Sequence, residues 1–519
     1  MDLSINQSDI IILVILVLSL IYWQISKPHK RFSKTIVPYL KPVPILGTTW
    51  RNFLQLENQI FSYGRAYTNF PDSRFAGFFE VLKPILLIRD PELVKQMGTK
   101  DFDHFMDHNF FIDETTDPLL GNMMIVMRGQ KWKDMRATLS PAFTGSKMRN
   151  MFNLVYNSSQ QMSSFLKEEI TKNGPLTTEV KSLFTKYSND VIATCAFGLE
   201  VDSLKDPDNK FYKFGQIVTG FGGIEALLKF LGFNLCPSLM KALDINFLDK
   251  KTMKFFRGLV HETMSLRIKD NIIRPDMIHL LMQARKGTLR DEDSLISNPK
   301  RDWTEDELTA QALIFLIAGF DTSSTLLMFL AYELALNPGV QECLQEEVDA
   351  IMDNNKDDAK LTYEQLAKAT YMDMVISETL RKWPPVVFLD RICLKDYDVE
   401  DNIGRKYTIK KGEGILFPVY HIQRDEKYFK DPEKFDPERF NEENKKDIKP
   451  YTYMPFGVGP RNCIGSRFAL METKALLFTI LKSFSFKKCA KTEQPLQLSK
   501  RDFDLVPANG IWVQIEARH

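Results

Sequence analysis

The chain has 519 residues and a formal net charge of +1, with 68 basic and 67 acidic side chains. This length is sufficient to bury a large core, and the near-neutral charge gives no support for a nucleic-acid partner. The six cysteines form no CxxC pair and no Cys/His cluster with zinc-finger spacing, which excludes a zinc finger and favours scattered, reduced thiols.

The N-terminal segment predicts a membrane anchor. Ile10–Ile25 is apolar apart from Ser19 and Gln24, and a basic stretch, Lys27–Lys34, follows it. A cleaved signal peptide carries its basic residues first, and an interfacial helix needs a polar face, so a signal anchor fits better than either. The positive-inside rule then leaves the remainder in the cytosol. We therefore expect an anchor over 1–26, a basic, Pro-rich connector over 27–47 and a catalytic domain over 48–519.

Helical patterns dominate the rest of the chain, and strand patterns are fewer. Trp303–Asn337 is a long apolar helix candidate, in which Thr304 and Glu307 have the spacing of a capping box. Leu361–Trp383 is a second helix candidate, which Pro384-Pro385 ends. No repeat or low-complexity linker divides the chain, so we predict one large, mainly α domain with a minor β portion. The predicted strands are Lys83–Ile88, Lys406–Ile409, Gly414–Pro418 and Gly510–Ile515.

The segment Phe211–Phe256 is rich in Phe, Gly, Leu and Ile. Its Gly220-Phe-Gly222-Gly223 resembles the start of a dinucleotide fingerprint, but Glu225 occupies the position of the last glycine. We therefore predict no nicotinamide site in this chain. The segment is interpreted as a mobile lid that contacts the membrane, or as a helix pair with loose apolar loops.

The sequence Pro455–Phe468, PFGVGPRNCIGSRF, places one thiol in a glycine-rich loop. If Ile464–Phe484 is a helix, its N-terminus lies beside Cys463 and favours the thiolate. A nucleophilic cysteine needs a nearby base, and the sequence suggests none, whereas a metal ligand needs no base. A metal-binding thiolate is therefore the favoured interpretation, and a structural cysteine in a flexible turn is the alternative.

This loop resembles the cysteine-ligand loop of the cytochrome P450 family, F-x-x-G-x-R-x-C-x-G. The matching residues are Phe456, Gly459, Arg461, Cys463 and Gly465. Four further family motifs occur in the family's order along nearly the whole chain. They are Trp132–Arg136 (W-x-x-x-R), Ala318–Thr322, Glu378–Arg381 (E-x-x-R) and Pro437–Phe440. The resemblance implies a haem-thiolate domain behind an N-terminal anchor.

The resemblance also implies roles for these residues. Cys463 would be the axial ligand of the iron of haem b. Asp321 and Thr322 would relay protons toward bound O2, for which small side chains at 318 and 319 leave room. The expected haem-binding residues are Trp132, Arg136, Arg391, Arg461, Phe456, Ala318 and Gly319, and the expected structural triad is Glu378, Arg381 and Arg439. The expected substrate pocket contains Phe105, Phe110, Phe111, Phe315, Val387 and Val506.

Such a protein would be a microsomal monooxygenase of the endoplasmic reticulum membrane, most similar to insect members that metabolise xenobiotics. It would oxidise lipophilic substrates with O2 and with electrons from NADPH through a partner reductase, and cytochrome b5 and membrane lipid are further candidate partners. Oxidation of an endogenous hormone or fatty acid is an alternative. A haem-thiolate isomerase or dehydratase, and a haem protein that binds lipophiles without turnover, are two others. The Asp321-Thr322 pair weighs against an isomerase, because peroxide rearrangement needs no proton delivery to O2.

Overall fold

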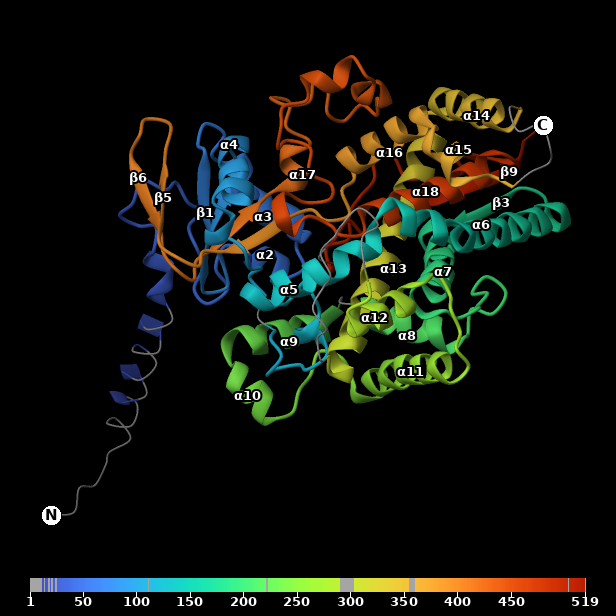
Figure 1. Cartoon of the computed structure of the whole chain (residues 1–519). Helices are drawn as coiled ribbons and strands as arrows, with labels where there is room; N and C mark the ends of the chain where they lie inside the picture. The colour runs from blue at the N-terminus through green and yellow to red at the C-terminus, as the bar shows by residue number, and fades with distance from the viewer. Residues whose placement is uncertain are drawn as a thin grey trace.

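The structure is a computed structural model, which describes residues 12–13, 15–16, 19, 22–23, 26–110, 112–220, 223–289, 303–353, 360–502 and 504–518. The predicted anchor lies largely outside these residues. The prediction of a mainly helical fold with a minor β portion is confirmed. In Figure 1 the strands β1, β5 and β6 lie on the side where the chain begins, and most of the long helices gather on the other side.

Helices account for most of the regular structure in the described residues. They are α2 (Trp50–Phe53), α3 (Gln59–Thr68), α4 (Pro91–Lys95), α5 (Gly129–Leu139), α6 (Gly145–Asn173), α7 (Val180–Ile192), α8 (Lys210–Thr219), α9 (Gly223–Leu235), α10 (Pro237–Ala242), α11 (Lys250–Lys269), α12 (Met277–Lys286), α13 (Glu305–Leu336), α14 (Pro338–Asp353), α15 (Tyr363–Ala367), α16 (Thr370–Lys382), α17 (Val419–Ile422) and α18 (Ser466–Leu481).

The long helix α13 runs through the helical part and contacts α7, α8, α11, α16 and α18 (Figure 1). Its predicted capping box is confirmed, because Glu307 N donates to Thr304 Oγ1 at 3.1 Å and Thr304 N donates to Glu307 Oε2 at 3.0 Å. Among the described helices, α13 alone is long and apolar enough to cross a membrane. Most of its side chains are buried by neighbouring helices, so it is the central helix of the core.

The strands form three sheets in the described part of the chain. They are β1 (Phe75–Glu80), β2 (Lys83–Ile88), β3 (Leu176–Glu179), β4 (Leu389–Ile392), β5 (Tyr397–Glu400), β6 (Lys406–Ile409), β7 (Gly414–Phe417), β8 (Phe484–Lys487) and β9 (Trp512–Ala517). The largest sheet has the order β1-β2-β7-β4, in which β2 and β7 are parallel and the other pairs are antiparallel. The second has the order β3-β9-β8, and β5 pairs with β6. All four predicted strands are present, with β9 displaced by two residues.

The predicted helix Leu361–Trp383 is wrong as a single element, because the chain leaves the helical conformation at Ala369 (φ −73°, ψ 84°). The structure has α15 and α16 in its place. A side chain from another helix stabilises the new N-terminus: Glu347 of α14 accepts hydrogen bonds from the backbone N–H groups of Tyr371 (2.7 Å) and Met372 (2.9 Å). A carboxylate at this point satisfies two donors that the helix leaves unpaired.

The segment between the predicted anchor and the first helices packs against the largest sheet. Phe32 is buried and contacts the Phe79 ring at a centroid distance of 5.2 Å. The His29 ring nitrogen Nε2 lies 2.9 Å from the carbonyl oxygen of Val81. Arg31 forms an ion pair with Glu413 and donates to the carbonyl oxygen of Thr408 at 2.9 Å. Side chains of this basic segment therefore belong to the apolar core around the sheet.

The cap provided by Glu347 can be tested by substitution. Glu347→Ala leaves the first N–H groups of α16 without their acceptor, so we expect the free energy of unfolding to fall by about 1–2 kcal/mol. The exposed neighbour Glu346 is the control, and Glu346→Ala should lower it by less than about 0.5 kcal/mol. Urea unfolding followed by circular dichroism measures both, and equal effects of the two substitutions would contradict the capping role.

Candidate active site

The cysteine loop approaches the rest of the protein closely before it enters α18. Gly457 (φ 81°) and Gly459 (φ 65°) have left-handed backbones, and a Cβ on Gly459 would lie 1.8 Å from the carbonyl oxygen of Gly98. Cys463 N donates to the carbonyl oxygen of Phe456 at 2.8 Å, which closes the loop. The Cys463 side chain is exposed. The backbone thus presents a thiol from a fixed loop.

Three influences on the pKa of Cys463 act in opposite directions. Desolvation by the surrounding protein raises the pKa of the Cys463 thiol, although the residue keeps an exposed surface, and the Gly465 backbone N–H and the positive charge of Arg136 lower it. The contribution of a backbone N–H group at the start of α18, which the sequence predicts, is therefore present. A bound metal cation would favour the thiolate further, because it deprotonates a coordinating thiol.

Arg461 and Trp132 lie together, as the sequence predicts for two haem-binding residues. The Arg461 guanidinium stacks on the Trp132 ring at 4.0 Å from its centroid. It also donates to the carbonyl oxygens of Met106 (2.9 Å) and Met127 (2.6 Å). Burial lowers the pKa of Arg461 to about 9. This arginine therefore holds the segment before α5 against the cysteine loop, a structural task that sequence analysis did not predict.

Arg136 and Arg391 approach the same region from α5 and β4. Arg136 donates to the carbonyl oxygen and to the Oδ1 atom of Asn462, both at 2.8 Å. Arg391 is 1% exposed, and its Nε atom has no hydrogen-bond partner among the described residues. Its positive charge also lowers the pKa of Arg461, so the two cations are close. A concentration of cations with a spare buried donor fits a ligand that carries carboxylates, such as the two propionates of haem.

His108 and Asp390 accompany Arg391, and sequence analysis missed both. His108 Nδ1 lies 2.9 Å from Asp390 Oδ1 and 3.4 Å from Arg391 Nη1. Burial alone would raise the pKa of Asp390, but His108, Arg391 and the Asn109 backbone N–H together hold it well below its usual value. No local pattern distinguishes His108 in the sequence, because its partners come from strand β4, far along the chain.

The face of α13 that sequence analysis assigned to O2 is the accessible part of a buried helix. Ala318 is exposed and Phe315 and Thr322 are half-buried, whereas most of the helix is buried. Thr322 Oγ1 donates to the carbonyl oxygen of Ala318 at 2.5 Å, one turn earlier, and α13 continues unbroken through both residues. A Cβ at position 319 would lie 2.3 Å from Ile192 Cδ1, so Gly319 allows α7 to approach α13 closely.

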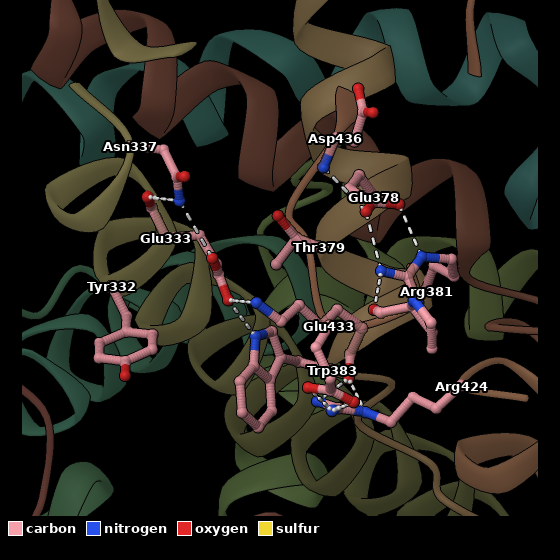
Figure 2. A network of polar contacts seen from close by, with 12 residues as sticks. Tyr332, Glu333, Asn337, Glu378, Thr379, Arg381, Trp383, Arg424, Glu433 and Asp436 are labelled. Carbon is pink, nitrogen blue, oxygen red and sulfur yellow. Dashed lines mark hydrogen bonds and ion pairs between the residues drawn. The ribbon is translucent and has the colours of Figure 1, made fainter. Parts of the chain in front are cut away.

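The predicted triad forms a buried ionic centre at the end of α16, and Figure 2 shows two of its members, Glu378 and Arg381. Arg381 donates to both oxygens of Glu378, at 2.7 and 2.8 Å, and both side chains are fully buried. Arg439 Nε lies 3.4 Å from Glu378 Oε1. The alternative of a solvated surface pair is therefore excluded for these residues.

Gln423 connects this ionic centre to the cysteine loop, and sequence analysis missed it. Its Nε2 atom donates to the carbonyl oxygens of Leu380 (3.0 Å) and Arg381 (2.9 Å). Its Oε1 atom accepts from Met454 N at 2.7 Å, where the cysteine loop begins. The side chain is fully buried. One glutamine thus fixes the distance between α16 and the loop.

The predicted substrate pocket is partly wrong. Phe105 is fully buried in the sheet core against Tyr397, at a ring distance of 5.0 Å. Val387 is 4% exposed and its neighbour Val386 is 44% exposed, so Val386 is the accessible side chain of this pair. Phe110 and Phe315 are half-buried and Val506 is 40% exposed, which leaves them accessible to a ligand. Phe111 lies outside the described residues.

A buried acid on α18, Glu472, was also missed. It is fully buried, its Oε2 atom accepts from Ser323 Oγ at 2.8 Å, and its Oε1 atom has no partner among the described residues. Burial raises the pKa of Glu472 to about 8. The helix that follows Cys463 is thus joined to α13 beside Thr322 through a carboxyl group that is protonated at neutral pH.

Comparison with known proteins identifies the class to which this fold and site belong. The family model described as Cytochrome P450 matches residues 37–513. The chain belongs to the cytochrome P450 family, and it is therefore an oxidoreductase of the monooxygenase type, a class that uses haem-thiolate and O2.

The similar proteins include several from insects. The chain is 47% identical to Cytochrome P450 9e2 of Blattella germanica, over 94% of this chain and 94% of the relative. It is 41% identical to Probable cytochrome P450 9f2 of Drosophila melanogaster, over 96% and 98% of the two chains. Cytochrome P450 6k1 of Blattella germanica is 36% identical, over 97% and 95%. The predicted family is confirmed, and these three similar proteins are from insects.

The buried triad predicts a large effect of a small substitution. Glu378→Gln leaves the Arg381 charge buried without a counter-charge, so we expect a loss of about 3–5 kcal/mol in unfolding free energy and little soluble protein. Glu433→Gln is the control, because Glu433 pairs with Arg424 at 2.6 Å and its side chain is 70% exposed. It should cost at most about 1 kcal/mol. Soluble yield and thermal unfolding by circular dichroism measure both, and an equally stable Glu378→Gln would refute the argument.

Glu472 predicts a stability that falls as pH rises. The folded-state pKa is about 8, above the unfolded value of about 4.3. Between these values the folded protein holds a proton that the unfolded chain releases, so stability decreases from about pH 4 to pH 8. Glu472→Gln removes this term and should match the wild type near pH 4.5, but exceed its stability by up to about 4 kcal/mol at pH 8. Urea midpoints at both pH values test this, and a pH-independent difference would contradict it.

Proposed function

We propose that this enzyme binds haem b through the sulfur of Cys463 and inserts oxygen into lipophilic small molecules. The observation that carries the proposal is the exposed Cys463 side chain, in a loop closed by the hydrogen bond from Cys463 N to the Phe456 carbonyl oxygen. The positive charge of Arg136 also acts on this thiol and lowers its pKa. A thiolate axial ligand and cations that bind the two propionates are what a haem-thiolate site needs.

The residues that would hold haem divide between sulfur and propionate contacts. Arg136, Arg391 and Arg461 with Trp132 would meet the propionates, and the unpartnered Nε of Arg391 is a donor for one of them. Phe456 would contact the porphyrin on the sulfur side. When bound, haem with a thiolate ligand supplies the chemistry that cleaves the O–O bond of O2.

The residues of α13 would serve the opposite face. Ala318 is small and exposed, which fits a residue beside bound O2. The Thr322 hydroxyl donates to the Ala318 carbonyl at 2.5 Å and can also accept a hydrogen bond, so it can pass a proton. Asp321, which precedes it, would resupply that proton from solvent. The half-buried Phe110, Phe315 and the exposed Val506 would contact an apolar substrate.

Electrons would come from NADPH through a membrane-bound reductase, and the enzyme would lie on the endoplasmic reticulum, with cytochrome b5 as a further candidate partner. Residues 1–26 would be the anchor, 27–47 the connector and 48–519 the catalytic domain. Exposed apolar side chains on neighbouring elements support contact with lipid: Leu54 is 56% exposed and Leu228 is 60% exposed, and the Phe53 and Phe230 rings beside them lie 6.3 Å apart.

The proposed substrates are xenobiotics, which accords with the insect origin of the similar proteins. Oxidation of endogenous lipids uses the same chemistry and differs in substrate alone. A screen of lipophilic compounds with purified enzyme, reductase and NADPH would separate the two.

The thiolate ligand has a direct spectroscopic test. The reduced protein should show a strongly red-shifted Soret band with carbon monoxide, because thiolate donates electron density to the iron. Cys463→Ala should abolish this band. Cys343→Ala is the control, since Cys343 is also exposed, and it should leave the band unchanged. A wild-type protein that binds haem without the red shift, or a red shift that survives in Cys463→Ala, would refute the proposal.

A further inference from the structure

Asn58 joins the start of α3 to the C-terminal part of the chain. Its side chain is 1% exposed, and its Oδ1 atom accepts from Ile60 N at 2.9 Å, which caps α3. The Nδ2 atom of the same amide donates to three carbonyl oxygens, those of Ser499 (2.7 Å), Asp502 (3.2 Å) and Asp504 (3.2 Å). One buried amide therefore holds both a helix N-terminus and a turn that begins 441 residues later in the chain.

The turn belongs to a short hairpin near the C-terminus. Ala508 N donates to the carbonyl oxygen of Gln497 at 2.8 Å, and Ser499 N donates to that of Val506 at 2.7 Å. Leu505 is 2% exposed and lies in the apolar core, whereas Val506 is 40% exposed. The hairpin therefore has one side fixed in the core and presents Val506, which we proposed as a substrate contact, on its accessible side.

A second helix N-terminus holds the chain just after the hairpin. Glu179, the N-cap of α7, accepts from Ile511 N at 3.3 Å, and Val180 N donates to the carbonyl oxygen of Ile511 at 2.9 Å. The next residue of α7, Lys181, donates to Asp321 of α13 at 2.8 Å. The hairpin is thus tied twice: to α3 at its turn, and through α7 to the proposed O2 face of α13.

An asparagine is suited to this double task because its amide both accepts and donates hydrogen bonds. Aspartate would keep the acceptor that caps α3, but it would set a buried carboxylate against three carbonyl oxygens. Serine would also cap the helix, but its single hydroxyl cannot replace the two N–H groups of the amide. A hairpin this short is marginally stable by itself, so the position of its turn depends on the contact with Asn58.

We propose that Asn58 is a positioning residue for substrate specificity, which acts by holding the hairpin turn so that Val506 contacts the substrate. This inference rests on the proposed function and deepens it. An apolar substrate long enough to reach Val506 gains affinity from that contact, and a shorter one does not. Asn58 therefore controls how strongly the enzyme prefers long apolar substrates, without touching them.

Alkylimidazoles of increasing chain length measure this preference without turnover. Their ring nitrogen binds ferric haem iron, and the resulting difference spectrum gives a dissociation constant. In the wild type, affinity should rise from 1-methylimidazole to 1-octylimidazole. In Asn58→Asp and in Asn58→Ser this gain should shrink about tenfold, which corresponds to about two methylene groups that no longer pack against the protein. The affinity for 1-methylimidazole should stay unchanged.

Asn209 provides the matched control, because it also caps a helix. Its Oδ1 atom accepts from Tyr212 N at 2.9 Å at the start of α8, and its amide donates to Ser203 Oγ (3.0 Å) and to the carbonyl oxygen of Asp206 (2.7 Å) in the preceding loop. Asn209→Asp thus repeats the same chemical change at a cap that does not hold the hairpin. It should keep the full chain-length preference.

A double substitution tests whether Asn58 acts through Val506. Val506→Ala should weaken the chain-length preference by itself, because it removes the proposed contact. Adding Asn58→Asp to Val506→Ala should then have little further effect, because the contact that Asn58 positions is already gone. Lowering the pH should partly restore the preference in Asn58→Asp, because a protonated carboxyl group regains a donor, and should leave Asn58→Ser unchanged.

Limited trypsin digestion of the purified protein follows the turn itself. Lys500 and Arg501 lie in the turn and are exposed. Release of the turn in Asn58→Asp should speed cleavage after these two residues several-fold, whereas Asn209→Asp should be cleaved there as slowly as the wild type.

An unchanged chain-length preference in both Asn58 variants would overturn the inference. An equal loss of affinity for 1-methylimidazole and for 1-octylimidazole would also overturn it, because such a loss reports general damage to the fold. A wild-type protein that gives no spectral shift with 1-methylimidazole would instead refute the proposed function.

Discussion

The fully buried ion pair between Glu378 and Arg381 is the interaction on which the arrangement of the site depends. Its cost in lost hydration is large, and the structure offsets it by giving the remaining donors and acceptors partners. Arg381 donates to the carbonyl oxygens of Gln423 (2.9 Å) and Pro432 (2.7 Å), and Asp436 N donates to Glu378 at 3.0 Å. Three chain segments therefore meet at one ion pair. Gln423 connects that pair to the start of the cysteine loop, because it bonds both the Arg381 carbonyl oxygen and Met454 N.

The helix α13 combines two tasks that usually conflict. It is the central apolar element of the core, yet its middle carries Asp321, Thr322 and Ser323. Each of these polar side chains has a partner: Lys181 for Asp321, the Ala318 carbonyl for Thr322 and Glu472 for Ser323. The cost of placing polar groups in an apolar helix is thus met by contacts with α7, α18 and its own backbone.

Local sequence information predicted the helices and strands well, but it predicted the hydrogen-bond and ion-pair partners of the site residues poorly. The capping box of α13 and the strands β2 and β6 depend on residues close together in the chain, and their bounds agreed closely. The break between α15 and α16 depends on Glu347, which belongs to another helix, so no pattern in 361–383 indicates it. In the site, the motif residues Cys463, Arg136 and Glu378 could be found from their spacing. Lys181, His108 and Gln423 could not, because each contacts a residue far away in sequence.

The surroundings of Gly319 and Phe105 could not be predicted for the same reason. A glycine in an apolar helix indicates a close approach, but the sequence does not say whether a ligand or another helix approaches. In this fold Ile192 occupies the space. The aromatic side chains near 105 likewise divide between two neighbouring apolar clusters, and only the three-dimensional packing decides to which cluster each ring belongs.

The burial of His29, Phe32 and Val37 against the largest sheet makes the basic segment a rigid bracket, because its side chains belong to the folded core. If the preceding residues cross a bilayer, the catalytic domain has little freedom to swing about that crossing point. The fold itself would then set the height and tilt of the catalytic domain above the lipid. A soluble form made by truncation should accordingly begin before His29, since a later start would remove core side chains together with the anchor.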